Sequence, residues 1–325
     1  MEVCVVGSYI QDLKYKLTKF PGCGETVYGK FKTSPGGKGF NQAVACSRQN
    51  IKTHFIGAIG SDTFAVNAIE FAQEESNLIP YWHKFQHNTG TAAIMVESNA
   101  DNRIIVDAGA NNFLTQNTIY NQEQIFTNNK ISVVLSQFEC DLGAVRAAFD
   151  LGFRYRAINI LNPAPMREFD LSLLEKVNII TPNVCEFQDI LKLIFKNSAD
   201  SIKNCLSEEF MEHGARAIAE YMEPNNPMVI VTLGEKGCFV VENNKSYMVS
   251  AFKVNSIDTT GAGDAFAGGL AAGLNIYQNN RKLAVNYANA TAALTTTFEG
   301  TAPTMPLRSI VSELLKTEED VHAIY

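Results

Sequence analysis

Short apolar segments alternate with helical segments through the second half of the chain. The strand-like segments span residues 131–135, 157–161, 179–181, 228–232 and 238–242. Alternation of this kind predicts a mostly parallel sheet with helices on both faces, because parallel neighbours need a crossover connection that is usually a helix. Residues 2–6 and 55–59 are expected to add strands to the same sheet. We therefore expect a doubly wound α/β fold that forms a single domain over residues 1–325.

Two stretches do not fit this alternation. Residues 13–35 are polar and punctuated by glycine and proline, with strand-like pieces at 26–28 and 30–32. Residues 91–106 contain two strand-like runs around a polar turn at 99–102, which is typical of a β-hairpin. Together these stretches are expected to form a small sheet over the functional site.

The composition disfavours several classes of partner. A formal net charge of −7, a pI near 5.4 and scattered basic residues disfavour nucleic acid and anionic membranes as main partners, since both need clustered positive charge. The 7 cysteines include no Cys-x-x-Cys pair, and their odd number fits reduced thiols. No apolar segment is long enough to cross a bilayer, and the apolar run at residues 1–10 lacks the flanks of a signal peptide. We expect a cytoplasmic protein.

The segment Asp258-Thr-Thr-Gly-Ala-Gly-Asp264 has the character of an anion-binding loop. It precedes an Ala/Gly-rich helical segment, so Gly261, Ala262 and Gly263 are expected at a helix N-terminus, where free N–H groups and the helix dipole attract phosphate. A carboxylate at Asp264 would repel a phosphate, which favours a role as the base that deprotonates an attacking hydroxyl. A helix-capping role for this acidic side chain is the alternative.

Polar residues also follow the other predicted strands. Asp12 comes after the first strand, at the sheet edge where ligands bind, and is a candidate acceptor for substrate hydroxyls; an ordinary turn aspartate is the alternative. A second glycine-rich loop, Pro35-Gly-Gly-Lys-Gly-Phe-Asn41, leads into a helical pattern. Its Lys38 and Asn41 offer donors to a ligand, with a plain tight turn as the alternative. The loop is no Walker A motif, because the chain has no G-x-x-x-x-G-K-[ST].

Other chemistries have less support in the sequence. His83 and His87 have helical metal-ligand spacing, but their aromatic neighbours suit a strand or core edge. The chain has no G-x-S-x-G elbow and no G-x-G-x-x-G fingerprint, which removes the usual grounds for a hydrolase or dehydrogenase. Residues 190–224 are expected to form two amphipathic helices with a polar joint at 196–200, and they suggest no chemistry.

Taken together, these motifs resemble the ribokinase-like (PfkB) carbohydrate kinases. The matching segments are Gly7-Ser8 with Asp12, residues 35–41, Asn162-Pro-Ala-Pro165, Thr181-Pro-Asn183 with Glu186, Thr232-Leu-Gly234 with Gly237, and residues 258–264. Their order and spacing follow that family over nearly the whole chain, and the two glycine-rich loops are the most specific parts. The resemblance implies phosphoryl transfer from ATP to a primary hydroxyl of a sugar, with D-ribose giving ribose 5-phosphate as the first choice.

The resemblance also implies roles for single residues. Asp264 would be the base, and Gly261, Ala262 and Gly263 the anion hole for the γ-phosphate. The sugar-binding positions would be Asp12, Gly36, Gly37, Lys38, Gly39, Asn41 and Glu139. Asn183 and Glu186 would organise Mg²⁺, held through water, and the phosphates. The nucleotide-binding edge would be formed by Thr232, Leu233, Gly234, Glu235, Lys236, Gly237 and Asn289.

A monovalent cation and a second subunit are implied as well. A K⁺ site that shapes the anion hole would take Asp258, backbone carbonyls near Thr260, Thr295, Phe298 and Gly300, and the side chain of Thr304. The small sheet of residues 13–35 and 91–106 would be a lid that closes on the substrate. The same lid would pair with a second copy in a homodimer.

One position departs from the family pattern. Family members that phosphorylate ribose usually carry Asn two residues before the substrate aspartate, where this chain has Ile10. A site that loses a hydrogen-bonding group loses discrimination, and an apolar side chain could instead face the base of a nucleoside. A purine nucleoside is therefore the alternative acceptor. A non-catalytic sugar or nucleotide sensor is the alternative of another class, although such a sensor would be free to lose Asp264.

Overall fold

Strand β1 lies inside the main sheet, whose order is β13-β12-β11-β10-β9-β8-β1-β4-β5. The structure, a computed structural model, describes residues 1–98, 101–195, 207–243, 245–278 and 280–322. The strands of this sheet are β1 (Glu2–Val6), β4 (Thr53–Ile59), β5 (Leu78–Lys84), β8 (Ile131–Gln137), β9 (Ile158–Asn162), β10 (Ile179–Ile180), β11 (Met228–Thr232), β12 (Cys238–Glu242) and β13 (Lys245–Val249). Pairing is parallel from β5 to β11 and antiparallel from β11 to β13. The predicted mostly parallel sheet is confirmed, and β13 is a strand that the sequence interpretation missed.

Helices cover both faces of the main sheet because successive strand side chains point to opposite sides. Val3 and Val5 pack with α1 (Lys38–Ser47), α2 (Thr63–Glu74), α8 (Ala262–Ile276) and α9 (Arg281–Thr295). Cys4 and Val6 pack on the other face with α5 (Leu142–Arg154), α6 (Val184–Ile194) and α7 (Glu208–Ala219). The other helices that the structure describes are α3 (Gln116–Tyr120), α4 (Gln124–Asn128), α10 (Arg308–His322), and the 3₁₀ turns Gly109–Phe113, Leu171–Lys176, Gly234–Lys236 and Ala302–Thr304. The fold is thus doubly wound, as expected.

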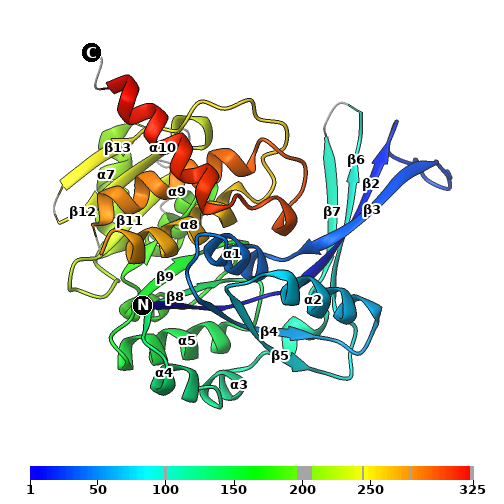
Figure 1. Cartoon of the computed structure of the whole chain (residues 1–325), viewed down its shortest axis with the longest axis horizontal. Helices are drawn as coiled ribbons and strands as arrows, with labels where there is room; N and C mark the ends of the chain where they lie inside the picture. Colours follow the sequence, from blue (N-terminus) through cyan, green and yellow to red (C-terminus); the bar gives the residue numbers. More distant parts are fainter. Residues whose placement is uncertain (99–100, 196–206, 244, 279, 323–325) are drawn as a thin grey trace.

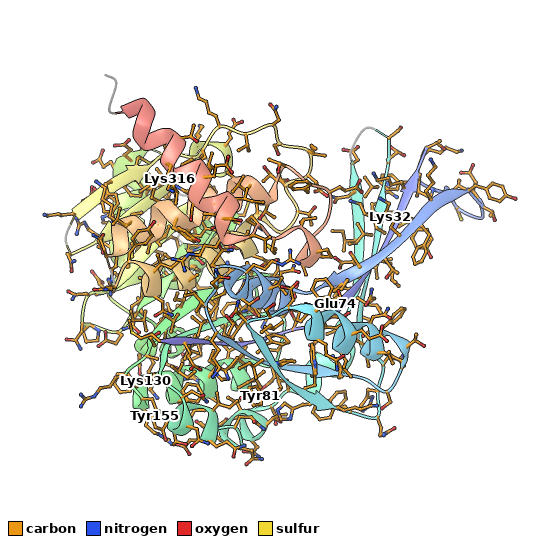
Figure 2. All side chains as sticks on the ribbon, viewed as in Figure 1. Lys32, Glu74, Tyr81, Lys130, Tyr155 and Lys316 are labelled. Carbon is orange, nitrogen blue, oxygen red and sulfur yellow. The ribbon has the colours of Figure 1, made fainter. Side chains whose placement is uncertain are left out.

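A second, smaller sheet stands off the main one (Figure 1). Its order is β3-β2-β6-β7, with β2 (Ile10–Leu17), β3 (Gly29–Gly36), β6 (Gly90–Val96) and β7 (Asn102–Asp107). Figure 2 shows Lys32 on this sheet. The predicted small sheet and its β6–β7 hairpin are confirmed, although positions 99 and 100 of the hairpin turn lie outside the described residues.

Several predicted boundaries were wrong. The piece at 26–28 is not a strand, whereas the piece at 30–32 belongs to the longer β3. Asp12 lies inside β2 and not in a turn, because the chain enters the second sheet already at Ile10. The expected joint at 196–200 between α6 and α7 lies outside the described residues. Among the helices that the structure describes, none combines the length and apolarity needed to span a membrane.

Candidate active site

The sheet reverses its winding at β1, and two side chains meet there. The neighbours of β1 are β4 on one side and β8 on the other, which makes a topological switch point, and ligands of open α/β sheets bind at the carboxyl edge of such a point. Ser8, just after β1, donates its hydroxyl to Glu139 Oε2 at 2.6 Å. The backbone N–H of Lys38 donates to the same oxygen at 2.8 Å. Glu139 therefore ties the start of α1 to the switch point.

The glycine-rich loop before α1 packs closely against the start of β2. Gly37 has φ of 88°, and a Cβ there would lie 2.6 Å from the backbone nitrogen of Ile10. At Gly36 a Cβ would lie 2.5 Å from Asp12 Oδ2, and at Gly39 it would lie 2.6 Å from the backbone nitrogen of Ser8. These glycines let the loop close on the protein's own backbone, which puts α1 beside Asp12.

The N-terminus of α8 opens into a cavity. Gly261 is its N-cap residue with φ of 80°, and no side chain caps the helix. A Cβ on Gly263 would meet no heavy atom within 4 Å, so packing does not demand a glycine there. The cavity has a volume of about 190 Å³, and its lining includes Gly261, Gly263 and Asp264. Uncapped first-turn N–H groups and open space above Gly263 suit a bound anion.

Asp264 is buried and held by two side-chain amides. Asn41 Nδ2 donates to its Oδ2 at 2.9 Å, and Gln42 Nε2 donates to its Oδ1 at 3.1 Å. Gln42 is held in turn, because Gln137 Nε2 donates to its Oε1 at 2.6 Å and its own Nε2 also reaches Asn162 Oδ1 at 3.1 Å. The carboxylate does not cap α8, so its orientation is set by this amide network.

The network includes a residue that the sequence interpretation missed. Gln42 was not among the predicted site residues, although it follows Asn41 directly in the glycine-rich loop. Thr301 was missed as well, and its hydroxyl donates to Asp12 Oδ2 at 3.0 Å. Buried amides and hydroxyls of this kind have no spacing rule, so the available signal was only their closeness to a recognised motif.

The charged groups around the cavity shift one another's pKa values. Burial raises the pKa of Asp264, and the charge of Lys38 and the bonds from Asn41 and Gln42 offset this only in part. Burial acts against the charge of Lys38, but Asp264, Glu139 and Glu186 outweigh it and raise its pKa. A buried carboxylate with a raised pKa is a better proton acceptor than an exposed one. Beside a charged lysine, it can deprotonate a hydroxyl that enters the cavity.

Asp12 lies across the site, and burial raises its pKa to about 6. If Asp12 accepts hydrogen bonds from the substrate, kcat/KM for the acceptor should fall about tenfold per pH unit below that pKa, because the carboxylate becomes protonated. The folded protein then holds this proton more tightly than the unfolded chain, so the contribution of Asp12 to stability decreases as pH rises from about 4 to about 6.

The pH dependence of kcat/KM checks this expectation. The Asp12→Asn enzyme should have a lower kcat/KM that no longer changes around this pH. A variant that kept the wild-type acidic limb would assign the titration to another group.

Asn183 and Glu186 face the same cavity from the start of α6. They form a capping box, in which Glu186 N–H donates to Asn183 Oδ1 at 2.9 Å and Asn183 N–H donates to Glu186 Oε2 at 2.8 Å. Thr181 and Thr232 line the cavity beside them. The structure therefore brings these predicted residues together with Lys38 and Asp264.

The rest of the predicted nucleotide edge lies beyond Thr232. Gly234 and Gly237 have positive φ values of 60° and 94°, which shape the turn between β11 and β12. Asn289 Nδ2 donates to the carbonyls of Val249 and Ser250, both at 3.2 Å. Asn289 thus links α9 to the end of β13. A ligand at this edge would contact the backbone of Val249 and Ser250, which Asn289 holds in position.

Of the other predicted K⁺ residues, Thr260 contacts Asp258, and so does an ammonium group that the sequence interpretation missed. Asp258 Oδ1 accepts from Thr260 N–H at 3.0 Å, and its Oδ2 lies 3.4 Å from Lys14 Nζ. The hydroxyl of Thr295 donates within α9 to the Thr291 carbonyl, and that of Thr304 donates to the Thr301 carbonyl. The side chain of Phe298 is exposed, and Gly300 has φ of 138°.

The two histidines at metal spacing are not brought into a cluster. His83 lies in β5, as its aromatic neighbours suggested, and the ring of His87 stacks on Phe113 with centroids 4.0 Å apart. Over the part of the chain that the structure describes, no group of three or more His, Cys, Asp or Glu side chains could hold a metal ion. The histidine pair therefore carries no argument for a metal site.

Comparison with known proteins decides the class. The model of the pfkB family carbohydrate kinases matches residues 1–308. The chain belongs to this family. As a pfkB carbohydrate kinase, it is similar to a ribokinase of Staphylococcus aureus, 30% identical over 318 residues that span 96% of this chain and 99% of the relative. It is also similar to a deoxyribokinase of Salmonella typhi, 31% identical over 322 residues, 98% of this chain and all (100%) of the relative.

The solved structure of a ribokinase from Thermotoga maritima has the same fold as this pfkB kinase. The two superpose with a TM-score of 0.86 at 29% identity, covering 97% of this chain and 99% of that one. The expected ribokinase-like fold is therefore confirmed, and the chain is an ATP-dependent carbohydrate kinase.

Proposed function

We propose that this kinase transfers the γ-phosphate of ATP to the primary hydroxyl of a pentose, with D-ribose as first choice and ribose 5-phosphate as product. The observation that carries the proposal is the position of Asp264. Its carboxylate is buried at the uncapped N-terminus of α8, on the wall of the cavity, and is oriented by Asn41 and Gln42. Asp264 takes the proton of the hydroxyl as the hydroxyl oxygen attacks the γ-phosphorus, and ADP leaves.

The phosphate is held by the start of α8. The space above Gly263 admits it, the first-turn N–H groups donate to its oxygens, and the charge of Lys38 faces the same cavity. Such preorganised donors stabilise the charge that develops during transfer. The adenine nucleotide would extend from there toward residues 232–237 and Asn289.

Mg²⁺ fits the residues at the start of α6. Mg²⁺ prefers oxygen ligands and keeps several waters, and it would shield the phosphate charge during transfer. The Glu186 carboxylate lines the cavity with Oε2 engaged in the capping box, which leaves Oε1 for a water bound to the metal. Asn183 would support the same water-mediated contact.

The acceptor would lie between Asp12, the loop 36–39, Asn41 and Glu139. Asn41 Oδ1 is buried and has no hydrogen-bond partner among the described residues, so it can accept from a sugar hydroxyl. Ile10 is two residues before Asp12 on β2 and therefore shares its face, so we expect its apolar side chain to border the acceptor. An apolar wall discriminates poorly between acceptors that differ by one hydroxyl. A purine nucleoside is the second candidate because Ile10 can contact a base.

Measured ADP release tests the acceptor. Wild-type enzyme is given ATP with ribose, 2-deoxyribose, fructose, adenosine or inosine, and we expect the highest kcat/KM with ribose. Ile10→Asn should raise the preference for ribose over 2-deoxyribose by about tenfold or more, because it restores a hydrogen-bonding group. A highest kcat/KM with adenosine or inosine would establish the nucleoside alternative instead. ATP binding without turnover of any acceptor would indicate a sensor.

We also propose that the second sheet is a lid that pairs with a second copy. Strand β7 is exposed along its whole length, and Ile104, Ile105 and Val106 are 53%, 66% and 53% exposed. An exposed apolar edge strand is normally covered by a partner. The mass of the protein in solution tests the pairing, because a dimer should have twice the 35.7 kDa mass of one chain.

A further inference from the structure

Lys14 reaches from the second sheet to the loop before α8 and to the loop after α9. It lies on β2 two residues after Asp12, so both side chains point to the same face. Its Nζ is 3.1 Å from Glu299 Oε1 and 3.4 Å from Asp258 Oδ2, although Lys14 and Asp258 are 244 positions apart in the chain. The side chains of Lys14, Asp258 and Glu299 are 21%, 16% and 28% exposed, so water only partly screens this contact.

Asp258 connects this contact to the phosphate loop. Its Oδ1 accepts from the backbone N–H and the hydroxyl of Thr260, at 3.0 and 2.6 Å. Thr260 directly precedes Gly261, the N-cap of α8. The backbone N–H groups of Ile257 and Asp258 donate to the Thr296 carbonyl at 2.7 and 3.1 Å, which joins this turn to the end of α9. The charge facing Asp258 thus acts on the turn that shapes the anion hole.

The loop that contains Glu299 also reaches the proposed acceptor site. Thr301 lies two residues after Glu299, and its hydroxyl donates to Asp12 Oδ2 at 3.0 Å. Strand β2 therefore contacts this loop through three side chains, those of Asp12, Lys14 and Lys16. These contacts fix the loop relative to the second sheet.

The charges of this cluster already balance. Lys16 Nζ lies 2.6 Å from Glu299 Oε2, so two ammonium groups face the two carboxylates of Asp258 and Glu299. The bond from Lys16, with that from Lys14, lowers the pKa of Glu299 to about 2. Burial acts against the charge of Lys14, but Glu299 and Asp258 outweigh it and raise its pKa. The raised pKa of Lys14 and the lowered pKa values of Asp258 and Glu299 keep these three groups charged at neutral pH, and a further cation would bring an unbalanced charge close to Lys14.

We infer that the ammonium of Lys14 takes the place at Asp258 expected for K⁺ and positions the turn before the anion hole, so that catalysis needs no monovalent cation. This inference rests on the proposed role of residues 258–264 as the phosphate loop. Lys14 is a positioning residue, since it acts on the reacting groups through Asp258 and Thr260.

Activity in different salts tests the inference on the full-length enzyme. ADP release with the preferred acceptor is measured at constant ionic strength in KCl, NaCl or tetramethylammonium chloride, and wild-type kcat should agree within about twofold among the three. Lys14→Met keeps the length of the side chain without its charge. Its kcat should fall at least about tenfold in tetramethylammonium chloride and recover at least about tenfold in KCl, because K⁺ can then bind at Asp258.

Two variants serve as matched controls. Lys14→Arg keeps the charge and should stay independent of K⁺. Lys16→Met removes the neighbouring charge, which faces Glu299 but not Asp258, and should also stay independent of K⁺. Activation of the wild type by K⁺ over Na⁺, or a Lys14→Met enzyme that needs no cation or is not restored by K⁺, would overturn the inference.

Thermal unfolding gives a readout that does not depend on turnover. K⁺, compared with the same concentration of tetramethylammonium, should raise Tm of Lys14→Met by about 2 °C or more and leave the wild type unchanged, since a bound ion stabilises the folded state. An equal rise in Tm of the wild type would mean that K⁺ binds beside Lys14, and it would refute the inference that the Lys14 ammonium takes the place of K⁺. A wild type without activity on any acceptor would contradict the proposed function, whereas these Tm shifts would still decide the role of Lys14.

Discussion

Replacing Asp264 by Asn is expected to lower kcat by about three orders of magnitude while the KM for the acceptor changes little. The amide has the shape of the carboxylate but cannot take the proton of the attacking hydroxyl, and a positioned base acts on the chemical step. The amide NH₂ of the new side chain would also face Asn41 Nδ2 or Gln42 Nε2, which now donate to the carboxylate. Two donors would then oppose each other within the buried network.

Steady-state kinetics and thermal unfolding separate loss of chemistry from loss of fold. Because burial raises the pKa of Asp264, a neutral side chain removes an unfavourable buried charge; this gain offsets the cost of the two opposed donors, so Tm should change little. Asp189→Asn makes the same chemical change on the exposed face of α6, where Asp189 pairs with Lys192, and should leave kcat unchanged. Near-normal turnover by the Asp264→Asn enzyme would refute the role of Asp264 as base.

Replacing Gly263 by Val should reduce kcat/KM by about a hundredfold or more and leave Tm nearly unchanged. A Cβ at this position meets no heavy atom within 4 Å, so the backbone can carry a side chain without strain. That side chain would occupy the cavity at the uncapped start of α8, where the γ-phosphate is proposed to bind. Losing a donor contact in an oxyanion-type hole typically costs about 10²–10³ in rate, and a displaced phosphate should lose about as much.

A second glycine variant provides the contrast. In Gly39→Val, the Cβ would lie 2.6 Å from the Ser8 backbone nitrogen, so this change should lower Tm as well as activity. ADP-release assays and thermal unfolding on both variants distinguish a glycine kept for a ligand from one kept for packing. A Gly263→Val enzyme with wild-type kcat/KM would show that no phosphate approaches that position.

Much of the fold was predictable because it depends on local patterns. Apolar strand segments, the helical segments between them and the glycines of both loops can be read along the chain, and the predicted sheet and second sheet follow from them. The antiparallel β13 was missed because Lys245–Val249 is only partly buried, unlike the equally short β12, which leaves a weak apolar pattern. Asp12 was placed at a strand end, since nothing local shows that the chain enters a second sheet at Ile10.

The residues of the candidate site were likewise predicted only in part. Asp264 and Asn41 were both predicted, but their hydrogen bond joins positions 223 apart in the sequence. Gln42 and Thr301 were missed, because a buried amide or hydroxyl acquires its role only from the partner that folding brings to it. For the same reason, the sequence predicts Asp258 as a cation ligand but gives no sign of the Lys14 ammonium that the structure places beside it.

By itself, the sequence determined the α/β class, the two glycine-rich loops and the carboxylate at the start of α8, because periodicity, positive φ and motif spacing are properties of neighbouring residues. Only the tertiary structure decided that Gln42 orients Asp264 and that Lys14 faces Asp258. The first contact joins α1 to α8, and the second joins strand β2 to the loop before α8. Both depend on the directions in which the folded elements point their side chains, and these directions bring together residues that are far apart in the sequence.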